Sequence, residues 1–437
     1  MKALSPAFVT EDIRQGPRLR VDRLWLWFWL FLIFYTTLVL LWSLLPESLQ
    51  EIGFLSVATT CIVLFMLFPA PVSLRARLLG LIVWLLGVYV MIMILPQPPT
   101  VDARSKYYAM FEMFSASDLI TQLFSSFDLE TTLVYSPFTL SLILKPLLGN
   151  FTSLGPWAVA LPYGVLWILS SFVWVQALYR KREEEPLFGD NSFTALLFVA
   201  LMALPSVAYW SMSFMKEVPF VAVNVFSAVR FSQRKYFSAI LLLIVVSLIR
   251  PYAVGIVASY WLFLQPSQKL RWMTALGSAA LFFAFTRANI IAIPKFALLT
   301  VYTFISPDPV DPNNWQLVSI DDFGSATPTL FLTLEGILLG TLLLVGIVAL
   351  IASVKRRTWL RLGLSILVGC AVLGVVDHFY SVNRLGSYSL FAFGAPAMRL
   401  KFTLWPLIVT WGAVALKAVK VGEKRHELGA IVGEKSA

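Results

Sequence analysis

The chain has 437 residues, of which 59% are hydrophobic and only 13% are charged, and its formal net charge is +10. A soluble protein carries about 25% charged residues. The basic residues gather in short segments between long apolar runs, as the positive-inside rule produces in membrane proteins. The composition therefore excludes an ordinary soluble domain, and it does not predict a nucleic-acid partner.

Long apolar runs predict the fold class. Several uncharged runs reach about 17 residues or more, which is long enough to cross a bilayer. They are continuous rather than alternating, so they predict helices and not membrane strands. We therefore expect an all-α polytopic integral membrane protein with about 12 transmembrane or re-entrant helices. The predicted helices cover residues 24–45, 52–68, 78–95, 133–148, 157–178, 193–210, 218–229, 236–249, 254–264, 272–293, 329–354, 360–376 and 402–416.

The charges between these runs predict the topology. Residues 1–23 and 417–437 are polar and basic, so both termini are expected to be cytoplasmic tails. Residues 24–416 would form a single membrane domain that is embedded in the lipid bilayer. Counting the passes then predicts three external segments, near residues 96–132, 294–328 and 377–401.

One predicted hairpin is too short to cross the membrane. Its two apolar runs, residues 218–229 and 236–249, would each form a helix about 20 Å long, against a hydrocarbon core of about 30 Å. The turn between them is basic, which marks the cytoplasmic side. Because the two helices have similar lengths, Lys216, Glu217 and Arg250 are expected to meet near the external side. Ionisable groups at such depth are costly and usually functional.

The residue types of this group suit a phosphate. Arg250 offers a planar fork of donors to phosphate oxygens, and Lys216 offers a compact positive charge. The alternative is an internal salt bridge that only positions helices. Arg384, Arg399 and Lys401 extend the cationic set, because they lie near the outer end of the last predicted pass, where the positive-inside rule does not place basic residues. Binding to outer-leaflet headgroups is the alternative for these three.

A carboxylate is needed if the site transfers a group to a hydroxyl. The acidic and aromatic segment after residue 100 holds Asp102 and Glu112, and Asp102 is preferred because it is closest to the membrane. Glu217 is a third candidate. The alternative is an ordinary solvated loop. No cluster of metal-ligating residues is evident in the sequence, so no metal site is predicted and the need for a divalent cation stays open.

Several short stretches resemble a known group. The run "LPSVAYWSMSFMKE" at residues 204–217, the following "RPY", and the stretches "FISPDPVDPNNW" and "GAPAMRLKF" are similar to bacterial membrane glycosyltransferases of the GT-C type and to O-antigen or exopolysaccharide polymerases. The resemblance spans roughly residues 195–406. It implies a GT-C-like fold in the bacterial inner membrane and chemistry on its outer side. It also implies a sugar or oligosaccharide donor linked to polyprenyl-phosphate or polyprenyl-pyrophosphate, with other polysaccharide assembly proteins as partners.

The function that follows is transfer or polymerisation of sugars from such a donor in cell-surface polysaccharide assembly. In this reading the protein is an enzyme, with Asp102, Glu112 or Glu217 as the catalytic carboxylate. A transporter or flippase for a lipid-linked glycan or another anionic substrate is the main alternative, and a non-catalytic scaffold is a third.

Overall fold

The structure is a computed structural model that describes residues 25–42, 46–115, 117–118, 121, 140–145, 147–148, 154–183, 185–265, 267–286, 291–321, 324–352, 356–385 and 397–434. This part of the chain is mostly helical. It contains six helices that are long and apolar enough to cross a membrane, or up to seven if one bent pair is a single span. The six are Trp25–Trp42, α2 (Gln50–Leu67), α3 (Leu74–Ile94), α7 (Ala160–Tyr179), α15 (Thr329–Ile351) and α16 (Arg356–Leu385).

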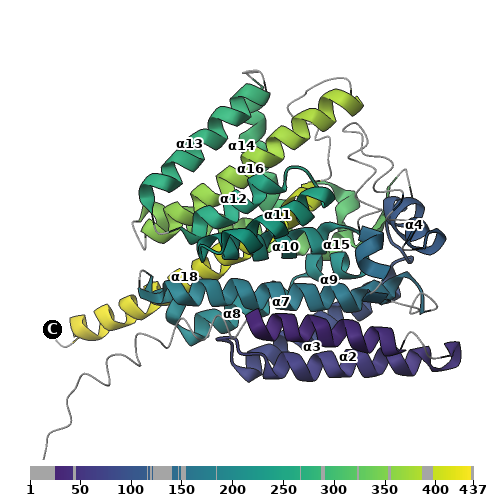
Figure 1. Ribbon diagram of the computed structural model, residues 1–437. Coiled ribbons are helices and arrows are strands. Elements are labelled where there is room, and N and C mark those ends of the chain that lie inside the picture. The colour runs from purple at the N-terminus through teal and green to yellow at the C-terminus, as the bar shows by residue number, and fades with distance from the viewer. Residues whose placement is uncertain are drawn as a thin grey trace, which may run out of the picture.

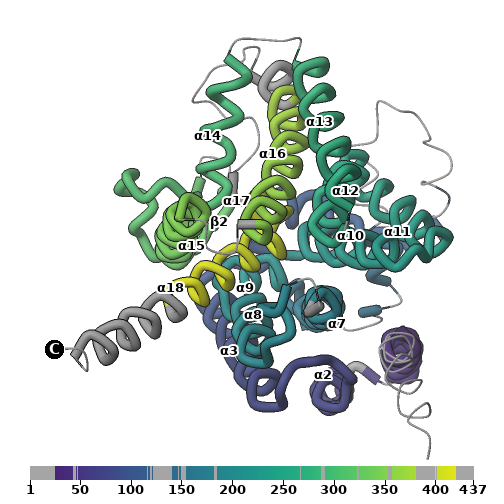
Figure 2. Tube along the Cα trace, turned by 90° about the vertical axis from the view of Figure 1, so that its left-hand side faces the viewer, coloured from purple at the N-terminus to yellow at the C-terminus, as the bar shows by residue number. Residues whose placement is uncertain are grey.

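α7 is the most buried of the candidate spans and lies between the α2–α3 pair and α10 (Glu217–Ser232) (Figure 1). α7 is apolar on every side, and 89% of its span is buried, as expected for a helix surrounded by protein. α2 and α3 lie on one side of it, and only 28% and 33% of their spans are buried. α16 lies on the other side together with α13 (Gln268–Phe285) and α14 (Ala292–Ile305), as Figure 2 shows from a second direction.

The predicted pass over residues 193–210 is not one straight helix. It consists of α8 (Asn191–Ala203) and α9 (Pro205–Met212), which are bent by 48° at Leu204. Pro205 is the first residue of α9, where a missing backbone N–H is tolerated but the preceding helix cannot continue through it. The break allows α9 to lead directly into the connection that carries Lys216.

The short hairpin is confirmed. α10 (Glu217–Ser232) and α11 (Tyr236–Ile249) are joined by a three-residue turn in which Arg234 adopts a φ of 59°. α12 (Ala253–Leu264) packs beside α10. Because α10 and α11 have similar lengths, the beginning of α10 and the end of α11 lie at the same end of the molecule. This is the end that also carries α4 (Ala109–Met113), and it is called the α4 end below (Figure 1).

Two predictions about the second half are wrong. The expected pass over residues 272–293 stops at Phe285, and part of the expected external segment 294–328 is the helix α14. Pro294 is compatible with α14 because it occupies the first turn, where backbone N–H groups have no partner within the helix. Lys295 is compatible because its ammonium lies 2.8 Å from Asp377 of α16.

The expected external segment 377–401 is also only partly a loop. α16 continues without a break to Leu385, and the side chain of Asp377 is 1% exposed. The charge suggested an end of the helix, but its partner Lys295 makes the buried position tolerable. After this segment come α17 (Ala397–Thr403) and α18 (Trp405–Glu434), so most of the predicted tail 417–437 is helical.

A small hairpin joins the connection after α14 to the segment after α3. β1 (Ser319–Ile320) pairs antiparallel with β2 (Ala326–Thr327). Ala326 N–H donates to the carbonyl of Pro99, and Val101 N–H donates to Ser325 Oγ. These bonds fix the residues that precede Asp102. The remaining short elements are η1 (Glu47–Leu49), η2 (Ala103–Tyr108), η5 (Pro156–Val159), η6 (Arg180–Glu183), η7 (Pro186–Gly189) and η8 (Pro312–Trp315).

Candidate functional site

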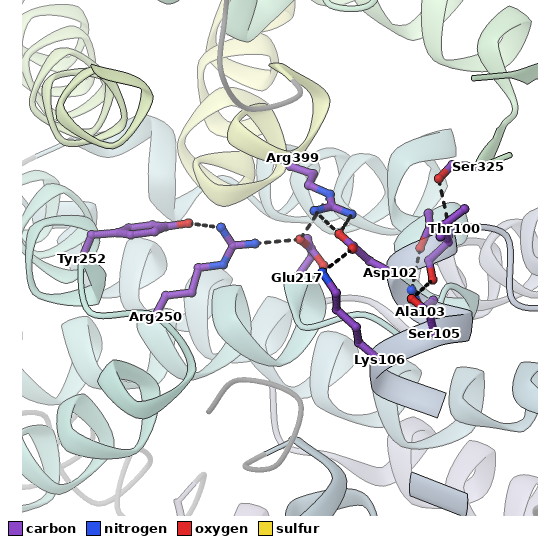
Figure 3. A network of polar contacts seen from close by, with 11 residues as sticks. Thr100, Asp102, Ala103, Ser105, Lys106, Glu217, Arg250, Tyr252, Ser325 and Arg399 are labelled. Carbon is purple, nitrogen blue, oxygen red and sulfur yellow. Dashed lines mark hydrogen bonds and ion pairs between the residues drawn. The ribbon is translucent and has the colours of Figure 1, made fainter. Parts of the chain in front are cut away.

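Charged side chains from four parts of the chain meet at the α4 end (Figure 3). Asp102 and Lys106 come from the segment after α3, Glu217 begins α10, Arg250 ends α11, and Arg399 belongs to α17. More than 290 residues separate the first from the last of these in the chain. The structure thus brings together most of the residues that the sequence proposed as a site.

Glu217 lies at the centre of this network. Its Oε1 accepts a hydrogen bond of 3.0 Å from Arg250, and Arg399 Nε lies 3.9 Å from the same oxygen. The Glu217 side chain is only 4% exposed, and its Oε2 accepts no hydrogen bond from the described residues. Arg250 also donates to the hydroxyl of Tyr252, so its guanidinium is held on two sides.

Asp102 is held by both of its oxygens. Lys106, four residues later in the short helix that follows Asp102, donates to Oδ1 at 3.0 Å. Arg399 donates to Oδ2 at 3.2 and 3.3 Å. The turn is a π-helix, Ala103–Tyr108, a form that recurs at functional sites. Burial alone would raise the pKa of Asp102, but the hydrogen bond from Lys106 and the charge of Arg399 outweigh it and lower the pKa below its usual value.

Lys216 is the cation of this group that makes no ion pair among the described residues. It lies in the connection between α9 and α10, outside the candidate spans, and its Nζ stands 5.7 Å above the ring of Tyr107. Burial, together with the nearby charge of Arg250, lowers the pKa of Lys216 well below its ordinary value. The carboxylates of Glu217 and Asp102 oppose this effect, and a further anion beside Lys216 would oppose it more strongly, because an opposite charge favours the protonated amine.

The network carries more positive than negative charge. The described site contains the cations Lys106, Lys216, Arg250 and Arg399 and the carboxylates Asp102 and Glu217. With Lys216 protonated, four positive charges and two negative ones leave a surplus of two. Arginine and lysine side chains of this kind bind phosphate oxygens by charge-assisted hydrogen bonds. The arrangement is therefore able to hold an anion of one or two charges.

Glu112, one of the residues proposed from the sequence, lies apart from this network. Glu112 is exposed on α4 and forms a hydrogen bond with the hydroxyl of Tyr108; burial, and after it this interaction, raises the pKa of that phenol. The side chain of Arg384 lies outside the described part of the structure. Glu112 therefore does not share the contacts that hold Asp102 and Glu217.

Sequence reasoning placed Lys401 in the external cationic set, but the structure shows it buried in a second ionic group beside the site. Lys401 Nζ lies 2.8 Å from Glu335 Oε1 and donates to the carbonyl of Ser306. Ser206, the second residue of α9, donates both its backbone N–H and its hydroxyl to Glu335. This group ties α9, α15 and α17 together next to Arg399. A single Glu within the apolar run of α15 was the available signal, since such a residue needs a partner.

Among the described residues, no group of three or more His, Cys, Asp or Glu side chains is arranged to hold a metal ion. Comparisons with protein-family models, curated proteins and solved structures found no match to this chain.

Proposed function

We propose that this protein transfers or polymerises sugars from a polyprenyl-phosphate-linked or polyprenyl-pyrophosphate-linked donor. The observation that carries the proposal is the surplus of positive charge around Arg250, Arg399 and Lys216 at one end of a set of apolar helices. A ligand that matches both features has an anionic head and a long apolar tail. Lipid-linked sugars have this chemistry, and the resemblance of residues 195–406 to GT-C-type enzymes and polymerases agrees with it.

The mechanism follows from the chemistry of such a donor. Lys216, Arg250 and Arg399 would hold the phosphates and stabilise the negative charge that develops on the leaving group. A carboxylate of the site, Glu217 or Asp102, would take the proton of the acceptor hydroxyl. The finer description belongs to the same proposal. It comprises a GT-C-like fold of about 12 passes, an inner-membrane location with cytoplasmic termini, and partners in polysaccharide assembly.

The second candidate is a transporter or flippase for a lipid-linked or other anionic substrate. The bent pair α8 and α9 supports it, because broken helices often line transport sites. Transport sites typically lie near the middle of the membrane. The charged network here lies at the ends of two helices, where α10 begins and α11 ends, and not halfway along them. This position favours the enzyme.

The two candidates differ in what a strain without this protein would accumulate. We would analyse its surface glycans and lipid-linked intermediates by mass spectrometry. Single repeat units that reach the outer side but remain unjoined would indicate a polymerase, and glycans that lack one sugar a transferase. Intermediates trapped on the inner side would indicate a flippase, and unchanged glycans would overturn both proposals.

Complementation then tests the site itself. Arg250→Ala should fail to restore the glycans although the protein is present in the membrane. Lys269→Ala is the matched control, because Lys269 is an exposed cation on α13 that takes no part in the network. Full complementation by Arg250→Ala would show that the protein does not need the charged network for its function.

A further inference from the structure

We infer that Glu217 and Asp102 are built-in counter-ions with different roles, and that a phosphate displaces Glu217 from the two arginines and thereby frees it to act on the acceptor. Asp102 stays in place as a fixed partner of the cations. The inference rests on the proposed function and assigns the two carboxylates within it.

The contacts of Glu217 make it the carboxylate that can be exchanged. Arg250 and Arg399 reach the same oxygen, Oε1, at 3.0 and 3.9 Å, and neither forms a two-bond fork with the carboxylate. A phosphate group offers several oxygens to the same two guanidinium groups and can be bound by two parallel bonds. The phosphate therefore replaces contacts to one carboxylate oxygen with contacts to several phosphate oxygens, which bind the two guanidinium groups more strongly.

Asp102 is anchored differently. Its Oδ1 is bonded to Lys106 of the same helical turn, and its Oδ2 is bonded to two nitrogens of Arg399. If Arg399 turns toward a ligand, Asp102 keeps Lys106 and remains a charged partner. A carboxylate that keeps a cation is a weak base, so Asp102 is suited to orient Arg399 rather than to accept a proton.

The position of Lys216 indicates where the phosphate binds. It precedes Glu217 in the chain, and among the described residues its ammonium lies over the ring of Tyr107 and forms no direct ion pair with a carboxylate. A phosphate that contacts Lys216 and Arg250 together must approach the Glu217 carboxylate, because Arg250 is bonded to it. Repulsion between the two anions then favours release of Glu217 from the arginines.

The released Glu217 can take part in the transfer step. Its carboxylate accepts the proton of the acceptor hydroxyl while that oxygen forms a bond to the anomeric carbon of the donor sugar. The bond from this carbon to the phosphate oxygen breaks, and its electron pair stays on the lipid phosphate, whose charge Lys216 and Arg250 stabilise. No oxidant, reductant or further reactant is needed.

Binding of inorganic pyrophosphate to the purified full-length protein in detergent tests the exchange without turnover. Calorimetry should show about tenfold tighter binding for Glu217→Gln than for the wild type, because the ligand no longer competes with a charged hydrogen-bond partner. Asp102→Asn, at a more exposed carboxylate, should tighten binding by a smaller factor. Asp311→Asn is the matched control and should bind as the wild type does, because Asp311 is an exposed carboxylate that only caps η8.

Glycan assembly in complemented cells separates the two roles. Glu217→Gln should support none, and Asp102→Asn should support a reduced amount, because Arg399 loses the carboxylate that orients it. Unchanged or weaker pyrophosphate binding by Glu217→Gln would overturn the exchange, and assembly sustained by Glu217→Gln would overturn its role as the base. If Glu217→Gln does not accumulate, Glu217→Asp replaces it, because the shorter carboxylate holds Arg250 less closely, and unchanged or weaker pyrophosphate binding by this variant would overturn the exchange. A wild type that binds neither pyrophosphate nor a short-chain prenyl pyrophosphate would instead contradict the proposed phosphate site.

Discussion

Lys401 and Glu335 form an ion pair of 2.8 Å in which the two side chains are 2% and 0% exposed, only two residues along α17 from Arg399. α17 is a short helix, so its orientation depends on contacts with its neighbours. The buried pair, with the bond from Lys401 to the carbonyl of Ser306, supplies such a contact. The direction in which Arg399 points is thus set from inside the protein.

Removing one partner of this pair should destabilise the protein. Lys401→Met leaves Glu335 buried without its cation, which typically costs about 3–5 kcal/mol. Lys401→Met combined with Glu335→Gln should recover most of the loss, because Gln carries no charge and its oxygen still accepts one of the two hydrogen bonds from Ser206. Thermal unfolding in detergent measures both. A double variant as unstable as the single one would show that the charge of Glu335 is not what Lys401 balances.

Arg250→Lys should weaken pyrophosphate binding by about tenfold although the charge is kept. The guanidinium contacts Glu217 with one nitrogen and Tyr252 with another, and an ammonium cannot reproduce this planar geometry. Tyr252→Phe should have a smaller effect, since it removes only the second contact. Calorimetric titration compares the three proteins. Unchanged binding by Arg250→Lys would show that Arg250 contributes only its positive charge to pyrophosphate binding.

Gly336 allows α14 and α15 to approach each other closely. A Cβ at this position would lie 2.5 Å from the backbone oxygen of Ile305, so Gly336→Ala should cost about 1–3 kcal/mol. A Cβ added at Gly277 of α13 would have no other atom within 4 Å. Gly277→Ala is therefore the control, and it should stabilise the protein slightly by its higher helix propensity. Unfolding midpoints of the two variants should move in opposite directions.

The acid stability of the other end of the molecule should depend on Asp190. Its hydrogen bond with Lys417, 2.8 Å long, lowers the pKa of Asp190 to about 2. The pKa in the unfolded chain is about 3.9. The folded pKa is the lower one, so the stabilisation is present above pH about 4 and is lost as the pH falls toward 2. The difference in unfolding midpoint between wild type and Asp190→Asn should shrink over that range, and a constant difference would contradict the pairing.

The α4 end and the turn of the short hairpin should face opposite sides of the membrane. Ser117→Cys, on the α4 side, should react with an impermeant thiol reagent in intact cells, and Ser232→Cys, beside the basic turn, should not. The natural cysteines are buried and should contribute little background. Labelling of Ser232→Cys from outside would invert the proposed topology.

The part of the site that the sequence predicted depends on local lengths. The equal runs of α10 and α11 place Glu217 and Arg250 at the same depth, and this can be read from the chain. Charged residues within apolar runs were less informative. Asp377 was interpreted as the start of an external segment, and Lys295 as part of another, because their pairing joins α14 to α16 across 82 residues.

The bend at Leu204 and the Lys401 group were missed for a related reason. Pro205 was visible, but a proline at that position is compatible with a kinked helix or with two helices. Glu335 and Lys401 lie 66 residues apart in the chain, and no local pattern links them. Tertiary pairing decides these features, and one sequence does not contain that information in a local form.

The shortness of α10, α11 and α12 has a consequence for the surrounding lipid. They have 16, 14 and 12 residues, and thus lengths of about 24, 21 and 18 Å against a hydrocarbon thickness of about 30 Å. α11 exposes apolar side chains along its length, including Phe237 and Ile244. Lipids beside it must compress to match, at a cost of a fraction of a kcal/mol per Å of mismatch. The protein should therefore be sensitive to acyl-chain length, and thin bilayers should favour it.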